Sequence, residues 1–156
     1  MNKIILLVFL SALLIGCNGK QETREGGASV QSPTETKEAY DPKTNKGIGE
    51  IKEVKLSLPL DQGMVTKGKE ISEMKCTTCH SLEENRIVGP GWKGLTSRRT
   101  PEWIMNMITN VDIMLAEDQA AQEMLEECLV RMPNQGLSIG DARDVLEFMR
   151  QIDREE

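Results

Sequence analysis

The sequence predicts an all-α domain over residues 57–156, preceded by a long polar segment. Apolar residues recur at spacings of three and four over several stretches of residues 61–153, which is the period of an amphipathic helix. The alternation that indicates a strand occurs only briefly, at residues 54–60. A chain of 156 residues is long enough for one domain with appendages, but not for two ordinary domains.

The first two expected helices lie on either side of a cysteine-containing segment. The first covers about residues 61–76, with Ile71 and Met74 facing inward. Residues 100–102, Thr-Pro-Glu, predict the start of the second, because a hydroxyl cap, a proline at the first helical position and an acid in the first turn favour a helix N-terminus. Its residues at core spacing are Trp103, Ile104, Met107, Ile108 and Val111.

The remaining expected helices lie near the C-terminus. The third covers about residues 117–130 and is acidic on its outer face. Its inward stripe consists of Ala121, Met124, Leu125, Cys128 and Leu129. Ser138 followed by Asp141 resembles a capping box and predicts the start of the last helix. The apolar stripe of that helix consists of Ala142, Val145, Leu146, Met149 and Ile152.

The N-terminus is typical of an export signal. A weakly positive start precedes an apolar run over residues 4–15, which is too short to cross a membrane comfortably. The run ends in Leu-Ile-Gly-Cys at residues 14–17, which resembles the bacterial lipobox. This resemblance implies a lipoprotein signal peptide over residues 1–16 and lipidation of Cys17, which anchors the protein on the periplasmic side of the inner or outer membrane of a Gram-negative bacterium. Ordinary secretion with a free Cys17 is the alternative.

Composition and charge indicate a flexible linker and restrict the kinds of partner. Residues 17–56 are rich in Gly, Ser, Thr, Glu, Lys and Gln, which predicts a flexible linker, although residues 54–60 are equally consistent with an arm laid against the domain. The net charge of −6 is concentrated in residues 61–156, where 11 Lys and Arg stand against 18 Asp and Glu. This acidity argues against nucleic acid as a partner and favours a protein partner with a basic docking face.

The most specific pattern is Cys-Thr-Thr-Cys-His at residues 76–80, which contains the only histidine of the chain. Cys76 and Cys79 have the spacing that attaches to the two vinyl groups of a haem, and His80 follows directly as an iron ligand. The motif therefore predicts one covalent haem c. Three other readings are weaker: a thioredoxin-like redox pair needs a βαβ context, a zinc site lacks a second ligand pair, and a structural disulfide leaves the histidine unexplained.

With this motif, residues 61–153 resemble the single-haem class I cytochromes c. Gly68, eight residues before the first haem cysteine, and Phe148 in the last helix match the positions where the family's first and last helices cross. Ser72 departs from the family, which has an aromatic residue four positions before that cysteine. The resemblance implies the class I cytochrome c fold, with three to five helices around one covalently bound haem.

The resemblance also implies the surroundings of the iron. Residues 88–90, Val-Gly-Pro, match the family's Gly-Pro segment, so the carbonyl of Pro90 is expected to accept a hydrogen bond from Nδ1 of His80. Residues 131–138 resemble the Met-Pro loop before the last helix, which makes Met132 the expected sixth ligand of the iron. The methionines interpreted as core packing are Met105, Met107, Met114 and Met124.

Three further side chains are expected near the haem, and each has two possible interpretations. Cys128 is interpreted as a buried and inert thiol, with an intermolecular disulfide as the alternative. Arg98 and Arg99 are candidates for pairing with the haem propionates, with exposed arginines at a helix entrance as the alternative.

These residues together favour electron transfer. An iron held by both a histidine and a methionine has no open coordination site, so we expect a one-electron carrier and not an enzyme. The resemblance implies a membrane-anchored carrier between periplasmic respiratory proteins, with a terminal oxidase or a nitrogen-oxide reductase as a candidate acceptor. Two alternatives remain open: a haem enzyme or gas-binding protein with a displaceable sixth ligand, and a fixed cytochrome subunit of a larger oxidoreductase.

Overall fold

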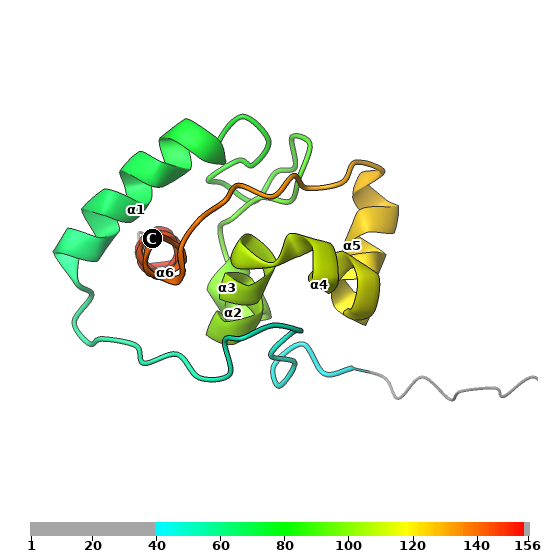
Figure 1. The fold of residues 1–156 in the computed structure, drawn as a ribbon. Coiled ribbons are helices and arrows are strands. Elements are labelled where there is room, and N and C mark those ends of the chain that lie inside the picture. The colour runs from blue at the N-terminus through cyan, green and yellow to red at the C-terminus, as the bar shows by residue number, and fades with distance from the viewer. Residues whose placement is uncertain (1–39, 155–156) are drawn as a thin grey trace, which may run out of the picture. The chain divides into compact units, whose positions relative to one another are not determined.

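The computed structural model describes residues 40–154. Within this range the chain forms six helices and no strand, which confirms the predicted all-α fold (Figure 1). In chain order they are α1 (Gln62–Lys75), α2 (Leu95–Arg98), α3 (Pro101–Thr109), α4 (Val111–Glu117), α5 (Gln119–Cys128) and α6 (Ile139–Ile152). The predicted signal peptide, residues 1–16, and Cys17 lie outside the described residues. No helix between residues 40 and 154 combines the length and the apolarity needed to cross a membrane.

Helices α1 and α6 cross in close contact, as predicted. A Cβ at Gly68 would collide with the carbonyl of Asp144 and come within 3.0 Å of Cβ of Phe148, so only glycine allows this approach. Ser72 is completely buried on the same face of α1, and its hydroxyl donates to the carbonyl of Gly68 at 2.6 Å. The small residue that replaces the expected aromatic therefore lies at the crossing without leaving a buried polar group unpaired.

The inward face of α1 differs from the prediction at one residue. Val65, Gly68 and Ser72 form the buried face, and Ile71 packs partly against the core. Met74 points to solvent and is 73% exposed, so its predicted inward orientation was wrong. The crossing with α6 determines which face is buried, and small residues at that crossing carry little hydrophobic signal.

The helix that begins at residues 100–102 is shorter than its apolar pattern suggests. Thr100 caps it as predicted, accepting a hydrogen bond from Trp103 N–H at 3.1 Å. However, α3 ends at Thr109, because Asn110 has φ −139° and ψ 44°, outside the helical region, and α4 begins at Val111. Val111 is nevertheless completely buried, so both helices contribute to one core.

Residues 40–60, which we call the arm, have no regular secondary structure but are bound along the domain as far as α1 (Figure 1). The side-chain amide of Asn106 on α3 holds its middle: Oδ1 accepts from Ile51 N–H at 3.2 Å, and Nδ2 donates at 2.9 Å to the carbonyls of Lys46 and Ile51. Ile51 and Leu60 are buried in the core.

The arm corrects the predicted domain boundary. Residues 40–56 belong to the folded domain, not to the linker predicted over residues 17–56. Residues 17–39 lie outside the described residues. The open question of whether residues 54–60 lie against the domain is answered in favour of an arm.

A buried carboxylate holds the C-terminal end of the arm. Glu147 on α6 is completely buried and accepts hydrogen bonds from Arg143 at 2.6 Å, from Arg150 at 2.8 Å and from the backbone N–H of Asp61 at 3.1 Å. Both arginines also donate to backbone carbonyls of the arm, those of Lys55 and Ser57. Burial alone would raise the pKa of Glu147, but these hydrogen bonds hold it below its usual value.

Candidate functional site

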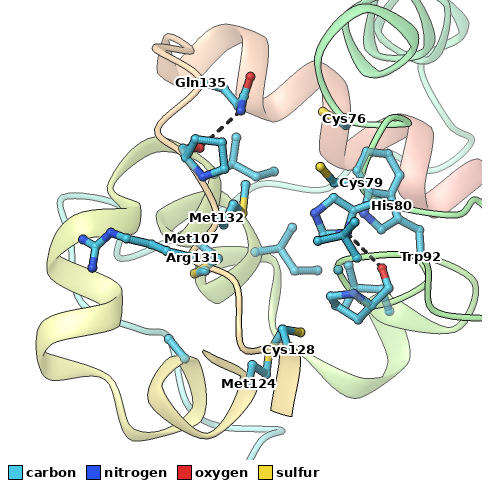
Figure 2. A pocket seen from close by; sticks show the side chains of 18 of the residues that line it. Cys76, Cys79, His80, Trp92, Met107, Met124, Cys128, Arg131, Met132 and Gln135 are labelled. Atoms are coloured by element: carbon cyan, nitrogen blue, oxygen red, sulfur yellow. Dashed lines mark hydrogen bonds between the residues drawn. The ribbon is translucent and has the colours of Figure 1, made fainter. Parts of the chain in front are cut away.

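A largely apolar cavity, partly open to solvent, separates the segment of residues 76–92 from the segment that joins α5 to α6 (Figure 2). Helices α3, α5 and α6 contribute to its walls. All the candidate site residues of the domain line it: Cys76, Cys79, His80, Pro90 and Met132. Open, apolar walls of this kind suit a large apolar group such as a porphyrin.

One wall, which we call the histidine wall, is built from the end of α1 and the residues that follow. Cys79 N–H and His80 N–H both donate to the carbonyl of Cys76, at 3.0 and 2.9 Å, so the motif folds into a tight turn directly after the helix. Nδ1 of His80 lies 2.9 Å from the carbonyl oxygen of Pro90, as predicted. Because a carbonyl can only accept, Nδ1 carries the proton and Nε2 is left as a possible metal ligand.

Two neighbours restrict the position of the imidazole. A Cβ at Gly89 would collide with the ring of His80, so the backbone of residue 89 forms a close-fitting support for it. The ring of Trp92, which is 4% exposed, lies 5.8 Å from the imidazole between centroids and is tilted by 37°. The histidine is therefore held by contacts on its ring as well as by its hydrogen bond.

The facing wall, which we call the methionine wall, contains Met132 (Figure 2). Met107 from α3 and Met124 from α5 line the same cavity, so their interpretation as core packing alone was incomplete. The other two methionines at helical spacing are buried in the core as predicted: Met105 and Met114. The cavity thus has sulfur-containing side chains on the side opposite His80.

Cys128 also lines the cavity and is only half-buried, which corrects its interpretation as a buried core thiol. Its spacing of four residues from Met124 was a signal that both side chains share one face of α5. The helix ends here because Leu129 adopts a left-handed backbone with φ 58°. Leu129 is consequently 86% exposed, and its predicted place on the inward stripe was wrong.

Charges near the cavity are few. Burial raises the pKa of the Cys76 thiol, and the adjacent positive charge of Lys75 lowers it by less, so the thiol is neutral near pH 7. Arg98 and Arg99 do not line the cavity. Arg98 donates to backbone carbonyls of its own loop, whereas the guanidinium of Arg99 lies 4.9 Å from the ring centroid of Trp103.

The residues present fit a covalent haem better than the competing uses of the cysteines. Cys76 and Cys79 are not joined by a disulfide, and both thiols are on the cavity wall. Within residues 40–154, no three His, Cys, Asp or Glu side chains are grouped as a metal site would require, and no strand provides a thioredoxin-like context. Two thiols and one oriented imidazole on the wall of an apolar cavity fit the covalent attachment of haem c.

Comparison with known proteins supports the same assignment. The model of the cytochrome c family matches residues 65–153, more than half of the chain. The fold is similar to cytochrome c from Rhodothermus marinus, with 31% sequence identity and a TM-score of 0.67 over 69% of this chain and 92% of that chain. Two structures of an engineered form of that protein, one with a bound carbene intermediate, are similar at 30% identity, with TM-scores of 0.66 and 0.63 and the same coverage. This chain therefore belongs to the cytochrome c family, has the class I fold, and is a haem-dependent electron-transfer protein.

Proposed function

We propose that this protein carries single electrons between periplasmic respiratory proteins through one haem c. Cys76 and Cys79 would form its thioether bonds, and His80 and Met132 would be the axial ligands of its iron. The observation that carries this proposal is the apolar cavity that His80 and Met132 approach from facing walls (Figure 2). When bound, the haem supplies the one-electron Fe(III)/Fe(II) couple. If His80 and Met132 both hold the iron, no position would be left for a substrate, and the site would favour electron transfer over substrate chemistry.

Each ligand side chain has a separate effect on the reduction potential. The hydrogen bond from His80 Nδ1 to the carbonyl of Pro90 orients the imidazole and makes Nε2 a stronger donor. The thioether of Met132 would favour Fe(II) and would therefore raise the potential relative to a second imidazole. The apolar walls exclude water and shift the potential in the same direction.

The mouth of the cavity is the proposed place of contact with redox partners. Val88 on the histidine wall and Val130 on the methionine wall line the cavity and are 37% and 55% exposed. Their sequence neighbours Ile87 and Leu129 are also exposed. A small apolar patch suits the brief encounters of electron carriers, and the net negative charge of the domain would steer a partner with a basic docking face towards it.

Membrane anchoring is the part of the proposal that rests on sequence alone. Lipidation of Cys17 would keep the carrier at the periplasmic face of a membrane. Mass spectrometry of the mature protein is expected to show a chain that begins at Cys17 and carries added acyl mass, and Cys17→Ala is expected to move the protein out of the membrane fraction. A mature chain without acyl mass would contradict the anchor but leave the electron-transfer proposal intact.

The test of the haem proposal begins with a pyridine haemochrome spectrum of the denatured, exported protein. One haem that stays with the polypeptide is expected, and a polypeptide that retains none would overturn the proposal. The ferric holoprotein should show the weak sulfur-to-iron charge-transfer band. Met132→Ala should remove that band, lower the potential and open the sixth position, whereas Met74→Ala, a methionine 73% exposed on α1, should change none of these.

The same experiment separates the alternatives. If Met132→Ala keeps the band, the axial ligand is another methionine of the cavity, Met107 or Met124. A wild-type protein without the band would have an open site, as in a haem enzyme or gas-binding protein. Copurification of a stoichiometric partner after gentle detergent extraction would indicate a fixed subunit instead of a mobile carrier.

A further inference from the structure

The methionine wall is held differently from the histidine wall. Among the hydrogen bonds between backbone groups outside the helices of residues 40–154, none involves residues 130–137, which carry Met132. The histidine wall has several, including Gly89 N–H to the carbonyl of Cys79 at 2.8 Å and Trp92 N–H to the carbonyl of Ser81 at 2.9 Å. We call residues 130–137 the Met132 segment. Its position must come mainly from side chains.

The first side-chain contact directly precedes the ligand. Nη2 of Arg131 lies 2.5 Å from Oδ1 of Asp112, in the first turn of α4. That helix is fixed in the core on both sides of Asp112, because Val111 and Met114 are completely buried. Arg131 therefore connects the residue next to Met132 to a rigid part of the domain.

The second contact lies on the other side of the ligand. Nζ of Lys75 donates to the backbone carbonyl of Gln135 at 3.3 Å. Lys75 is the last residue of α1 and precedes the first haem cysteine, Cys76. This contact therefore links the Met132 segment to the end of α1, where the histidine wall begins. Met132 lies between the two points of attachment.

We propose that Arg131 and Lys75 are positioning residues for the sixth iron ligand: by holding the Met132 segment against α4 and α1, they favour the iron-bound state of Met132. This inference rests on the proposed function, in which Met132 binds the iron. Both side chains act through the backbone on either side of the ligand.

The exposure of these contacts sets the size of the expected effect. The side chains of Arg131 and Asp112 are 54% and 61% exposed. An ion pair in this position contributes little, so loss of it should shift the equilibrium towards unbound Met132 by only about two- to fivefold. An external ligand such as imidazole competes with Met132 for ferric iron, and its apparent Kd should fall by the same factor.

The experiment is an imidazole titration of the ferric holoprotein, followed through the sulfur-to-iron charge-transfer band. Arg131→Ala and Asp112→Ala should each lower the apparent Kd about two- to fivefold, and the double variant should behave like either single variant. Lys75→Gln should shift the Kd in the same direction, and Arg131→Lys should restore part of the wild-type value. Lys69→Ala is the matched control, because Lys69 forms an ion pair with Glu73 on α1 at 59% and 57% exposure.

Ionic strength provides a second readout that a purely structural role would not give. Added salt should lower the apparent Kd of the wild type towards that of Arg131→Ala and should change the double variant much less. The inference is overturned if Arg131→Ala and Asp112→Ala bind imidazole like the wild type while Met132→Ala binds it far more tightly. If Met132→Ala itself binds imidazole like the wild type, the ligand assignment has failed instead.

Discussion

The arm and the Met132 segment both lack helices and strands, yet the structure holds them in different ways. Peptide groups of the arm are bound by side chains that are almost fully buried, above all Asn106 and the hydrogen-bonded group around Glu147. The Met132 segment is bound by exposed charges of Arg131 and Lys75. Buried hydrogen bonds are costly to leave unmade, whereas exposed ion pairs are not. Loss of the hydrogen bonds that hold the arm should therefore destabilise the fold. Loss of the contacts that hold the Met132 segment should mainly change how strongly Met132 binds the iron.

The largest expected effect lies at the arm. Glu147→Ala should lower the free energy of unfolding of the holoprotein by about 3–5 kcal/mol, because it leaves the buried charges of Arg143 and Arg150 without their carboxylate. Urea or thermal unfolding measures this loss. Glu73→Ala, at 57% exposure, is the control. A loss below about 1 kcal/mol, typical of an exposed pair, would remove the distinction between the two segments.

The same carboxylate predicts how stability depends on acid. The pKa of Glu147 is lower in the folded protein than its ordinary value of 4.5, so the folded state favours the ionised form. Its contribution is complete above pH 4.5 and is lost as the pH falls through the folded pKa. Unfolding measured as a function of pH should show this decline, and Glu147→Gln should make it shallower. Part of the decline should remain, because hydrogen bonds from Ser138 also lower the pKa of Asp141.

A smaller effect is expected from the middle of the arm. Asn106→Ala should cost about 2–3 kcal/mol of stability, because the N–H and carbonyl of Ile51 lose a buried partner. Asn106→Asp should cost at least as much, because it places a buried carboxylate oxygen against the carbonyls of Lys46 and Ile51, which both need a donor. Hydrogen exchange at the Ile51 amide should accelerate with Asn106→Ala, while the reduction potential stays at the wild-type value. A shifted potential with unchanged stability would contradict the separation of the two segments.

The smallest effect on stability is expected in the Met132 segment. Gly136 has φ +64° and no atom lies within 4 Å of a Cβ built there, so Gly136→Ala introduces backbone strain without a clash. The strain should either lower the free energy of unfolding by roughly 1 kcal/mol or be relieved by a local shift of the segment. Such a shift would lower the apparent Kd for imidazole. Gly140→Ala in the first turn of α6, where φ is not positive, should leave both quantities near the wild type. Equal effects at both glycines would show that the positive φ of Gly136 does not constrain the Met132 segment.

Sequence reasoning succeeded where the cause of a structure lies within a few residues. The caps at Thr100 and Ser138 depend on side chains that accept from N–H groups three positions away, and both are present. The cysteine motif and Pro90 are near neighbours in the chain as well, and the carbonyl of Pro90 meets Nδ1 of His80 as expected. Local chemistry was therefore sufficient for the histidine wall.

The errors lie where partners are distant in the chain. The arm reads as linker because its composition is polar, but its partner Asn106 is 55 residues away from Ile51. Met74 was placed inward because its hydrophobicity is visible in the sequence, whereas the crossing at Gly68 and Ser72 that decides the buried face is not. Met107, Met124 and Cys128 were assigned to the core because a helical stripe that lines a cofactor cavity has the same period as one that packs against another helix.

The amide of Asn106 has a practical consequence for anyone who trims or grafts this haem module. Composition suggests a cut near residue 57. This cut would remove Ile51 and leave the buried side-chain amide of Asn106 without its hydrogen-bond partners. A fragment starting there should express poorly and shed stability, whereas one starting ahead of Tyr40 keeps every described contact of the arm. A stable haem module should therefore begin more than twenty residues before the start of α1, the helix that precedes the cysteine motif.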